Sequence, residues 1–170
     1  MTACCPTKTP KTTLLNYTPL FMLVIISTLA GVAIAYGTQN ISLIYIMHGA
    51  MGIFLCILSM LKLFNLKGFM DGFQKYDLLA GRTRFYALAY PFIELVLGLS
   101  YLALFKPELT YALTVFVMVF GSLGVLNAIR LKLNINCPCM GSILKAPVST
   151  VTLVENMAMA VMAAYMLFII

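Results

Sequence analysis

Charged residues are scarce in this chain of 170 residues, since only 9% of them are Asp, Glu, Lys or Arg, and tryptophan is absent altogether. Hydrophobic residues make up 62% of the sequence, and the mean hydropathy is +1.01. Soluble globular domains carry about 25% charged residues, so this composition excludes that class. We therefore expect an integral membrane protein whose main surroundings are the lipid bilayer.

Several functional motifs are also missing. No nucleotide-binding loop, Ser-His-Asp set, zinc motif or flavin fingerprint is recognisable, which argues against a self-contained enzyme. No basic stripe interleaved with aromatic residues is present, so the net charge of +6 does not indicate a nucleic-acid partner. No Pro/Gly/Ser-rich linker, charge run or repeat divides the chain. A single compact membrane bundle is the expected organisation.

Five apolar stretches are long enough to cross a membrane. A bilayer core about 30 Å thick needs roughly 20 apolar residues in a helix. The sequence therefore predicts an all-α integral membrane helical bundle with five transmembrane helices, preceded by a short polar arm over residues 1–16. The connector over residues 65–82 mixes aromatic and charged residues, which is typical of a helix lying in the headgroup layer. The predicted spans are residues 18–36, 41–61, 85–105, 109–129 and 148–170.

Loop charge predicts the orientation, because Lys and Arg accumulate in the loops that stay in the cytoplasm. Ten of the eleven basic residues precede the first span or lie between spans two and three or four and five, and Lys106 alone falls on the opposite side. In a bacterial inner (cytoplasmic) membrane this pattern predicts a cytoplasmic N-terminus and an exported, periplasmic C-terminus. The ten residues are Lys8, Lys11, Lys62, Lys67, Lys75, Arg82, Arg84, Arg130, Lys132 and Lys145.

Two pairs of cysteines are the strongest chemical signal. Cys137 and Cys139 flank Pro138 in the loop before the last span, and Cys4 and Cys5 lie in the N-terminal arm on the same predicted side. The pair in the loop suits thiol–disulfide exchange, because a disulfide closed across one residue is strained and readily reduced. Two thiolates also bind Cu(I) or another thiophilic metal, although they are too few for a closed tetrahedral site. A turn with packed cysteines is the third interpretation.

Ionisable residues inside the predicted spans are further candidates, since each costs about 2.5–3.5 kcal/mol to insert. Glu94 and Glu155 lie at similar depths, about 10–14 Å from the predicted cytoplasmic end of their helices. They are expected to share a proton, bind a cation, couple to the thiols or form hydrogen bonds between helices. His48 lies between Met47 and Met51, so it is either a copper contact or a packed histidine. Cys56 is expected to be a buried small hydrophobe.

Five segments, in this order, resemble the MauE branch of the DoxX-like membrane proteins. The resemblance covers residues 41–170 and implies a four-helix membrane domain, to which residues 17–37 add an extra transmembrane helix. It also implies a role in methylamine utilisation, in the processing, transport or maturation of the disulfide-rich small (beta) subunit of methylamine dehydrogenase. The segments are residues 62–69 (KLFNLKGF), 76–80 (YDLLA), 90–98 (YPFIELVLG), 137–142 (CPCMGS) and 150–156 (TVTLVEN).

Three classes of function follow. The first is a redox-associated membrane protein that supports disulfide formation in an exported client through a thiol partner, with no bound cofactor. The second is a copper- or mercury-type heavy-metal transport or handling protein that uses the two cysteine pairs. The third is a non-catalytic structural subunit. Thiols stay reduced in the cytoplasm, so the predicted side favours receipt of reducing equivalents or metal over oxidation of a client.

Overall fold

The computed structural model describes residues 18–74, 84–130 and 148–169, and every regular element in these residues is an α-helix. Five of the helices are long and apolar enough to cross a membrane, as predicted. The expected all-α membrane bundle is therefore confirmed. The helices are α1 (Thr18–Gly37), α2 (Leu43–Phe64), α3 (Leu66–Phe73), α4 (Arg84–Leu102), α5 (Pro107–Arg130) and α6 (Val148–Ile169).

Local backbone chemistry explains where the long helices begin and end. Ser42 is extended and caps α2 by accepting a hydrogen bond from the backbone N–H of Tyr45 at 3.4 Å. Pro107 opens α5, where its missing N–H costs nothing. Leu104 and Lys106 have positive φ angles of 52° and 38°, and this left-handed turn ends α4 three residues before the predicted limit.

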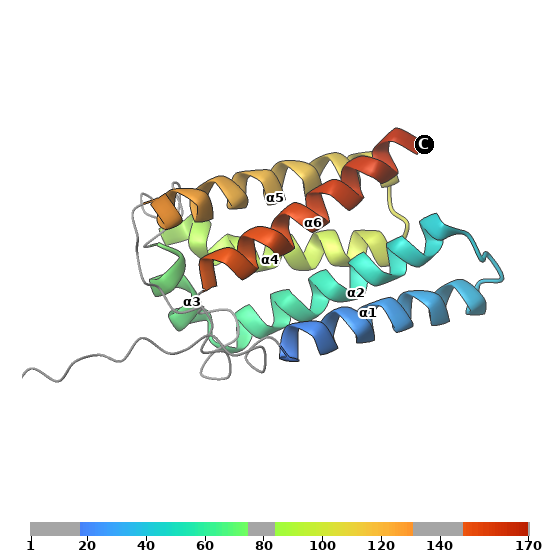
Figure 1. Cartoon of the computed structure of the whole chain (residues 1–170), viewed down its shortest axis with the longest axis horizontal. Helices are drawn as coiled ribbons and strands as arrows, with labels where there is room; N and C mark the ends of the chain where they lie inside the picture. The colour runs from blue at the N-terminus through green and yellow to red at the C-terminus, as the bar shows by residue number, and fades with distance from the viewer. Residues whose placement is uncertain (1–17, 75–83, 131–147, 170) are drawn as a thin grey trace, which may run out of the picture.

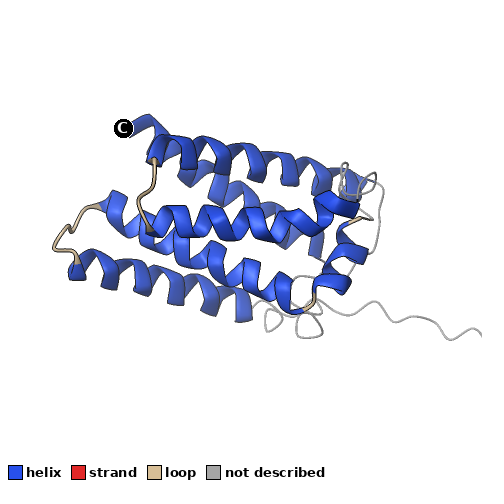
Figure 2. Cartoon of the chain, turned by 180° about the vertical axis from the view of Figure 1, so that it is seen from behind, coloured by secondary structure: helices blue, strands red, loops and turns tan. Residues whose placement is uncertain are grey.

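The long helices run along one axis, so the molecule has two distinct ends (Figure 1). The α1–α2 and α4–α5 turns and the last turn of α6 lie at one end, here called the turn end (Figure 1). Helix α3, the first residue of α1, the last of α5 and the first of α6 lie at the other, here called the α3 end. The view from behind shows the same arrangement (Figure 2).

The buried core lies between α2, α4, α5 and α6, and α1 is added to its outside. Met51, Leu55, Tyr101 and Met118 are among the core residues, each at most 2% exposed. By contrast, most apolar residues of α1 face outward, where lipid would contact them. Among the described helices, α1 packs closely against α2 alone.

Small residues join α1 to α2. A Cβ atom added to Gly31 would lie 2.5 Å from the carbonyl oxygen of Ile46, and one added to Gly49 would lie 2.8 Å from the Cα of Gly31. The two backbones are therefore in direct contact, which is the usual way in which membrane helices pack through small residues. Helix α1 is thus a fixed part of the bundle.

The connector after α2 forms the short helix α3 at the place where the sequence predicts an interfacial helix. Phe69 and Phe73 are four residues apart on one face of this helix, and they are only 1% and 3% exposed. Both rings pack against Tyr90 of α4. These aromatic side chains therefore face the protein. Residues 75–82 of the predicted connector lie outside the described residues.

Candidate functional site at the α3 end

A buried ion pair joins α2 to α4 at the α3 end. The Nζ of Lys62 donates to both carboxylate oxygens of Glu94, and the two residues are 7% and 1% exposed. The sequence prediction placed Lys62 in the loop after the second span, and this was wrong. Helix α2 continues to Phe64, so Lys62 belongs to its last turn and its charge is directed into the bundle.

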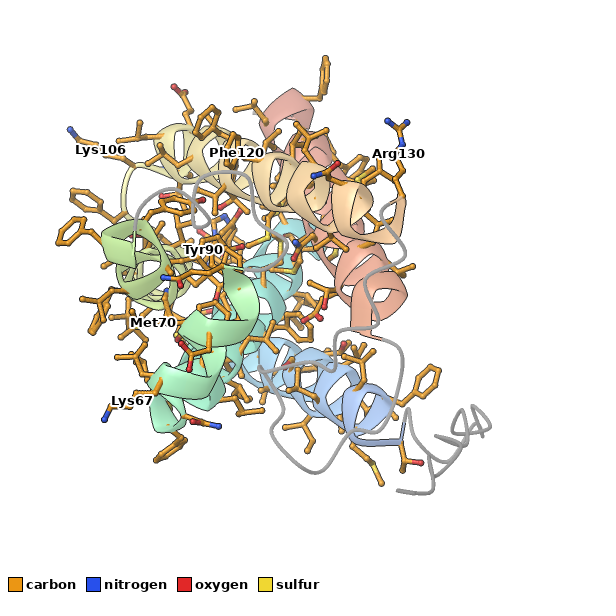
Figure 3. All side chains as sticks on the ribbon, turned by 90° about the vertical axis from the view of Figure 1, so that its left-hand side faces the viewer. Lys67, Met70, Tyr90, Lys106, Phe120 and Arg130 are labelled. Carbon is orange, nitrogen blue, oxygen red and sulfur yellow. The ribbon has the colours of Figure 1, made fainter. Side chains whose placement is uncertain are left out.

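Aromatic rings surround the lysine of this pair. The Nζ of Lys62 lies 5.1 Å from the ring centroid of Tyr90 and 5.7 Å from that of Phe69, within range of cation–π attraction. Phe73 stacks on Phe69 with ring centroids 5.0 Å apart. Viewed onto the α3 end, Tyr90 lies in the middle of the bundle, whereas Lys67 and Arg130 point outward (Figure 3). We call Phe69, Phe73 and Tyr90 the aromatic cluster.

The buried ion pair depends on both of its partners. A buried charge is tolerated only when it is paired and hydrogen-bonded, and two-point contact with the carboxylate supplies both. Loss of one partner would leave an uncompensated buried charge, which costs about 3–5 kcal/mol. Each charge of the pair therefore requires the other, and the rings of Tyr90 and Phe69 lie beside the lysine.

Tyr90 extends the site toward α5 and α6. A Cβ atom added to Gly121 of α5 would lie 3.1 Å from the hydroxyl oxygen of Tyr90 and 3.2 Å from the Nδ2 of Asn156. The absence of a side chain at Gly121 therefore lets polar atoms of α4 and α6 approach the same point of α5. Asn156 is 8% exposed and follows Glu155 directly, so the site reaches the first turns of α6.

Glu155 has different surroundings from Glu94. Glu94 is bound by Lys62, whereas Glu155 is half-buried and lines a groove between α1, α2 and α6. Helices α4 and α6 do not pack closely on each other. Glu94 therefore lies in the contact between α2 and α4, and Glu155 lies at the groove.

His48 lies near the turn end, where it bridges α2 to α4 and α5. Its Nδ1 is 3.3 Å from the carbonyl oxygen of Tyr101, and its Nε2 contacts the hydroxyl of Tyr111. Because a carbonyl only accepts, the Nδ1–H donates to it, and in the neutral ring Nε2 then accepts from the tyrosine. Within the described ranges, no three His, Cys, Asp or Glu residues are grouped so that they could hold a metal ion.

Of the five cysteines, the structure describes Cys56 alone. Cys4, Cys5, Cys137 and Cys139 lie outside the described residues. The helix residues that adjoin their segments are Thr18 of α1, Arg130 of α5 and Val148 of α6, and all belong to the α3 end (Figure 1). Cys56 is half-buried, and its Sγ would lie 2.8 Å from a Cβ added to Gly98 of α4, so it packs between two helices.

Together, the helices and this site define a multi-pass membrane protein. The family model described as methylamine utilisation protein MauE matches residues 39–169, and the chain belongs to that family. The resemblance seen in the sequence is confirmed, and α1 lies outside the match. No curated protein and no solved structure matches the chain.

Sequence reasoning singled out Glu94 but missed its partner. The signal was available, because Lys62 and Glu94 carry opposite charges near the same end of consecutive long helices. It was hidden because the hydropathy of the second span falls at Lys62, which resembles an ordinary helix boundary. The two glycines at positions 31 and 121 gave no sequence signal of their close contacts.

Proposed function

We propose that this protein is a membrane-embedded thiol–disulfide exchange protein that supports maturation of a disulfide-containing exported partner, with Cys137 and Cys139 as the exchanging pair. Membership of a methylamine utilisation family supports a role in methylamine utilisation. The observation that carries the proposal is the common position of Thr18, Arg130 and Val148 at the α3 end. The two cysteine pairs belong to the segments of sequence that adjoin these helix residues, and the Lys62–Glu94 pair lies at the same end of the bundle.

The exchange balances within this pair and its partner. The Cys137 thiolate attacks one sulfur of the partner's disulfide, which breaks that bond, forms a mixed disulfide and releases a partner thiolate that takes up a proton. The Cys139 thiolate then attacks the Cys137 sulfur, closes the Cys137–Cys139 disulfide and releases the second partner thiolate. The partner gains two electrons, and the pair loses two.

The compartment decides the direction of exchange. On the predicted cytoplasmic side a dithiol reductant of the cell would return the pair to its thiol form, so the pair would reduce a thiol partner on that side and act on the exported client only through that partner. A membrane-impermeant thiol reagent added to intact cells tests this side directly. Protection of Cys137 and Cys139 supports the cytoplasmic side, whereas ready modification would reverse the orientation and make the pair an oxidant for the client.

A trapping experiment tests the exchange itself. Cys139→Ser removes the thiol that resolves the mixed disulfide, so we expect a partner adduct that is visible without reductant and lost with it. Cys56→Ala is the matched control, because Cys56 is packed between α2 and α4 and should leave the adduct pattern of the native chain unchanged.

Two outcomes would contradict the proposal. If neither Cys137→Ser nor Cys139→Ser traps an adduct or changes the redox state of any partner, the pair performs no exchange. If these variants instead lose bound Cu(I) or change metal tolerance while partner disulfides stay the same, the protein handles a thiophilic metal. If the variants change neither partner disulfides nor metal binding, the protein is a structural subunit.

A further inference from the structure

A groove between α1, α2 and α6 has no part in the thiol chemistry. Its volume is about 450 Å³, which is in the range of sites for small organic ligands. Rim residues such as Phe21 and Val154 are 60% and 64% exposed, so the groove opens toward the lipid. Its apolar walls include Phe21 and Val24 of α1, Met51 and Phe54 of α2, and Met159 and Met162 of α6.

The hydroxyl of Ser27 is a buried polar group of this groove. Ser27 of α1 lines the groove and is 2% exposed, yet its Oγ has no hydrogen-bond partner among the described residues. Other helical hydroxyls of this bundle behave differently: Ser100 and Ser122 each donate to the carbonyl four residues earlier at 2.8 Å. Buried hydroxyls are normally hydrogen-bonded, so the Ser27 hydroxyl indicates a ligand that accepts a hydrogen bond from it.

The depth of this hydroxyl limits the kind of ligand. Ser27 lies nine residues after Thr18, which corresponds to about 13 Å along α1. A hydrocarbon core is about 30 Å thick, so Ser27 lies near its middle, well below the polar headgroups. A phospholipid would bring only its acyl chains to this depth. The acceptor must therefore belong to a neutral molecule that is soluble in the membrane core.

The walls of the groove favour a ring. Phenylalanine rings stack on planar ring systems, and methionine sulfur makes favourable contacts with aromatic edges. Two Phe and three Met side chains line the groove together with the Glu155 carboxyl group.

We propose that the groove binds a lipid-soluble ring compound bearing a carbonyl group, the quinone class, with Ser27 donating a hydrogen bond to the carbonyl oxygen. The proposal concerns binding and is independent of the cysteine chemistry. Because the family match begins at residue 39, one wall of this site is supplied by the additional helix α1.

The test uses the purified full chain in lipid nanodiscs and measures its unfolding midpoint against ligand concentration, since a ligand that binds the folded state raises that midpoint. Decyl-ubiquinone is the probe, and decylbenzene is the matched compound without a carbonyl. We expect saturable stabilisation by the quinone alone. Ser27→Ala should weaken its binding about tenfold, as expected for one lost hydrogen bond in a buried site.

Two variants of α6 locate the binding to the groove. Ala158 lines the groove and is exposed, so Ala158→Phe should fill it and abolish the stabilisation. Val161 is 62% exposed on the same helix and does not line the groove, so Val161→Phe is the control and should bind as the native chain does.

Three results would overturn the proposal. Equal stabilisation by decylbenzene, unaffected by Ser27→Ala, would show a plain acyl-chain groove. Equal binding to Ala158→Phe and Val161→Phe would place the quinone elsewhere. Binding that appears only after deletion of residues 2–16 would show that the chain's own arm occupies the groove.

Discussion

The two ends of the bundle bury polar groups in opposite ways. At the α3 end, Lys62 and Glu94 form an ion pair beneath the aromatic cluster. At the turn end, His48 contacts Tyr101 and Tyr111 through hydrogen bonds that need no formal charge. Both sites connect α2 with α4, so they differ in chemistry more than in architecture. A charged site depends strictly on both partners, whereas a neutral one loses less when one is removed.

The largest expected effect is the loss of one charge at the α3 end. Glu94→Ala leaves the Lys62 ammonium buried without its carboxylate, so the free energy of unfolding should fall by about 3–5 kcal/mol. Reversible unfolding in mixed detergent micelles measures this quantity. The matched control is the double variant Lys62→Met with Glu94→Leu, which removes both charges and should lose far less stability. A double variant as unstable as the single one would show that the ion pair is not the cause.

The neutral site at the turn end should respond more weakly. His48→Leu removes the acceptor of the Tyr111 hydroxyl, and because Tyr111 is fully buried, we expect a loss of about 1–3 kcal/mol. Adding Tyr111→Phe removes the stranded hydroxyl and should restore part of the stability, measured in the same unfolding experiment. A loss as large as that of Glu94→Ala would abolish the distinction drawn between the two ends.

The difference between the ends also explains what the sequence could predict. The long apolar runs predicted five membrane helices within a few residues of their observed limits, because span length follows directly from bilayer thickness. The partner of Glu94 could not be obtained in this way, since Lys62 lies 32 positions earlier and its pairing depends on how α2 and α4 pack.

The groove could not be predicted from the sequence for the same reason. Ser27 is an ordinary residue in an apolar helix, and nothing local distinguishes it from Ser100 or Ser122. Its importance arises because α1 and α6, which are far apart in sequence, line the same space. Chemistry carried by a short motif, such as the cysteine pair, is visible in sequence, whereas chemistry formed between helices requires their packing.

The smallest effect tests the aromatic cluster rather than the ion pair. Phe69→Leu keeps an apolar side chain of similar volume against α4 but removes the ring 5.7 Å from the Lys62 Nζ. We expect a loss of about 1 kcal/mol, the scale of one partly desolvated cation–π contact. Phe85→Leu is the control, because Phe85 is 78% exposed on α4 and should have little effect. In the Lys62→Met, Glu94→Leu background the cost of Phe69→Leu should shrink, since no cation remains for the ring to contact. If that cost is unchanged there, Phe69 stabilises the α3 end by packing alone, and the two ends differ in their ion pair and not in their aromatic surroundings.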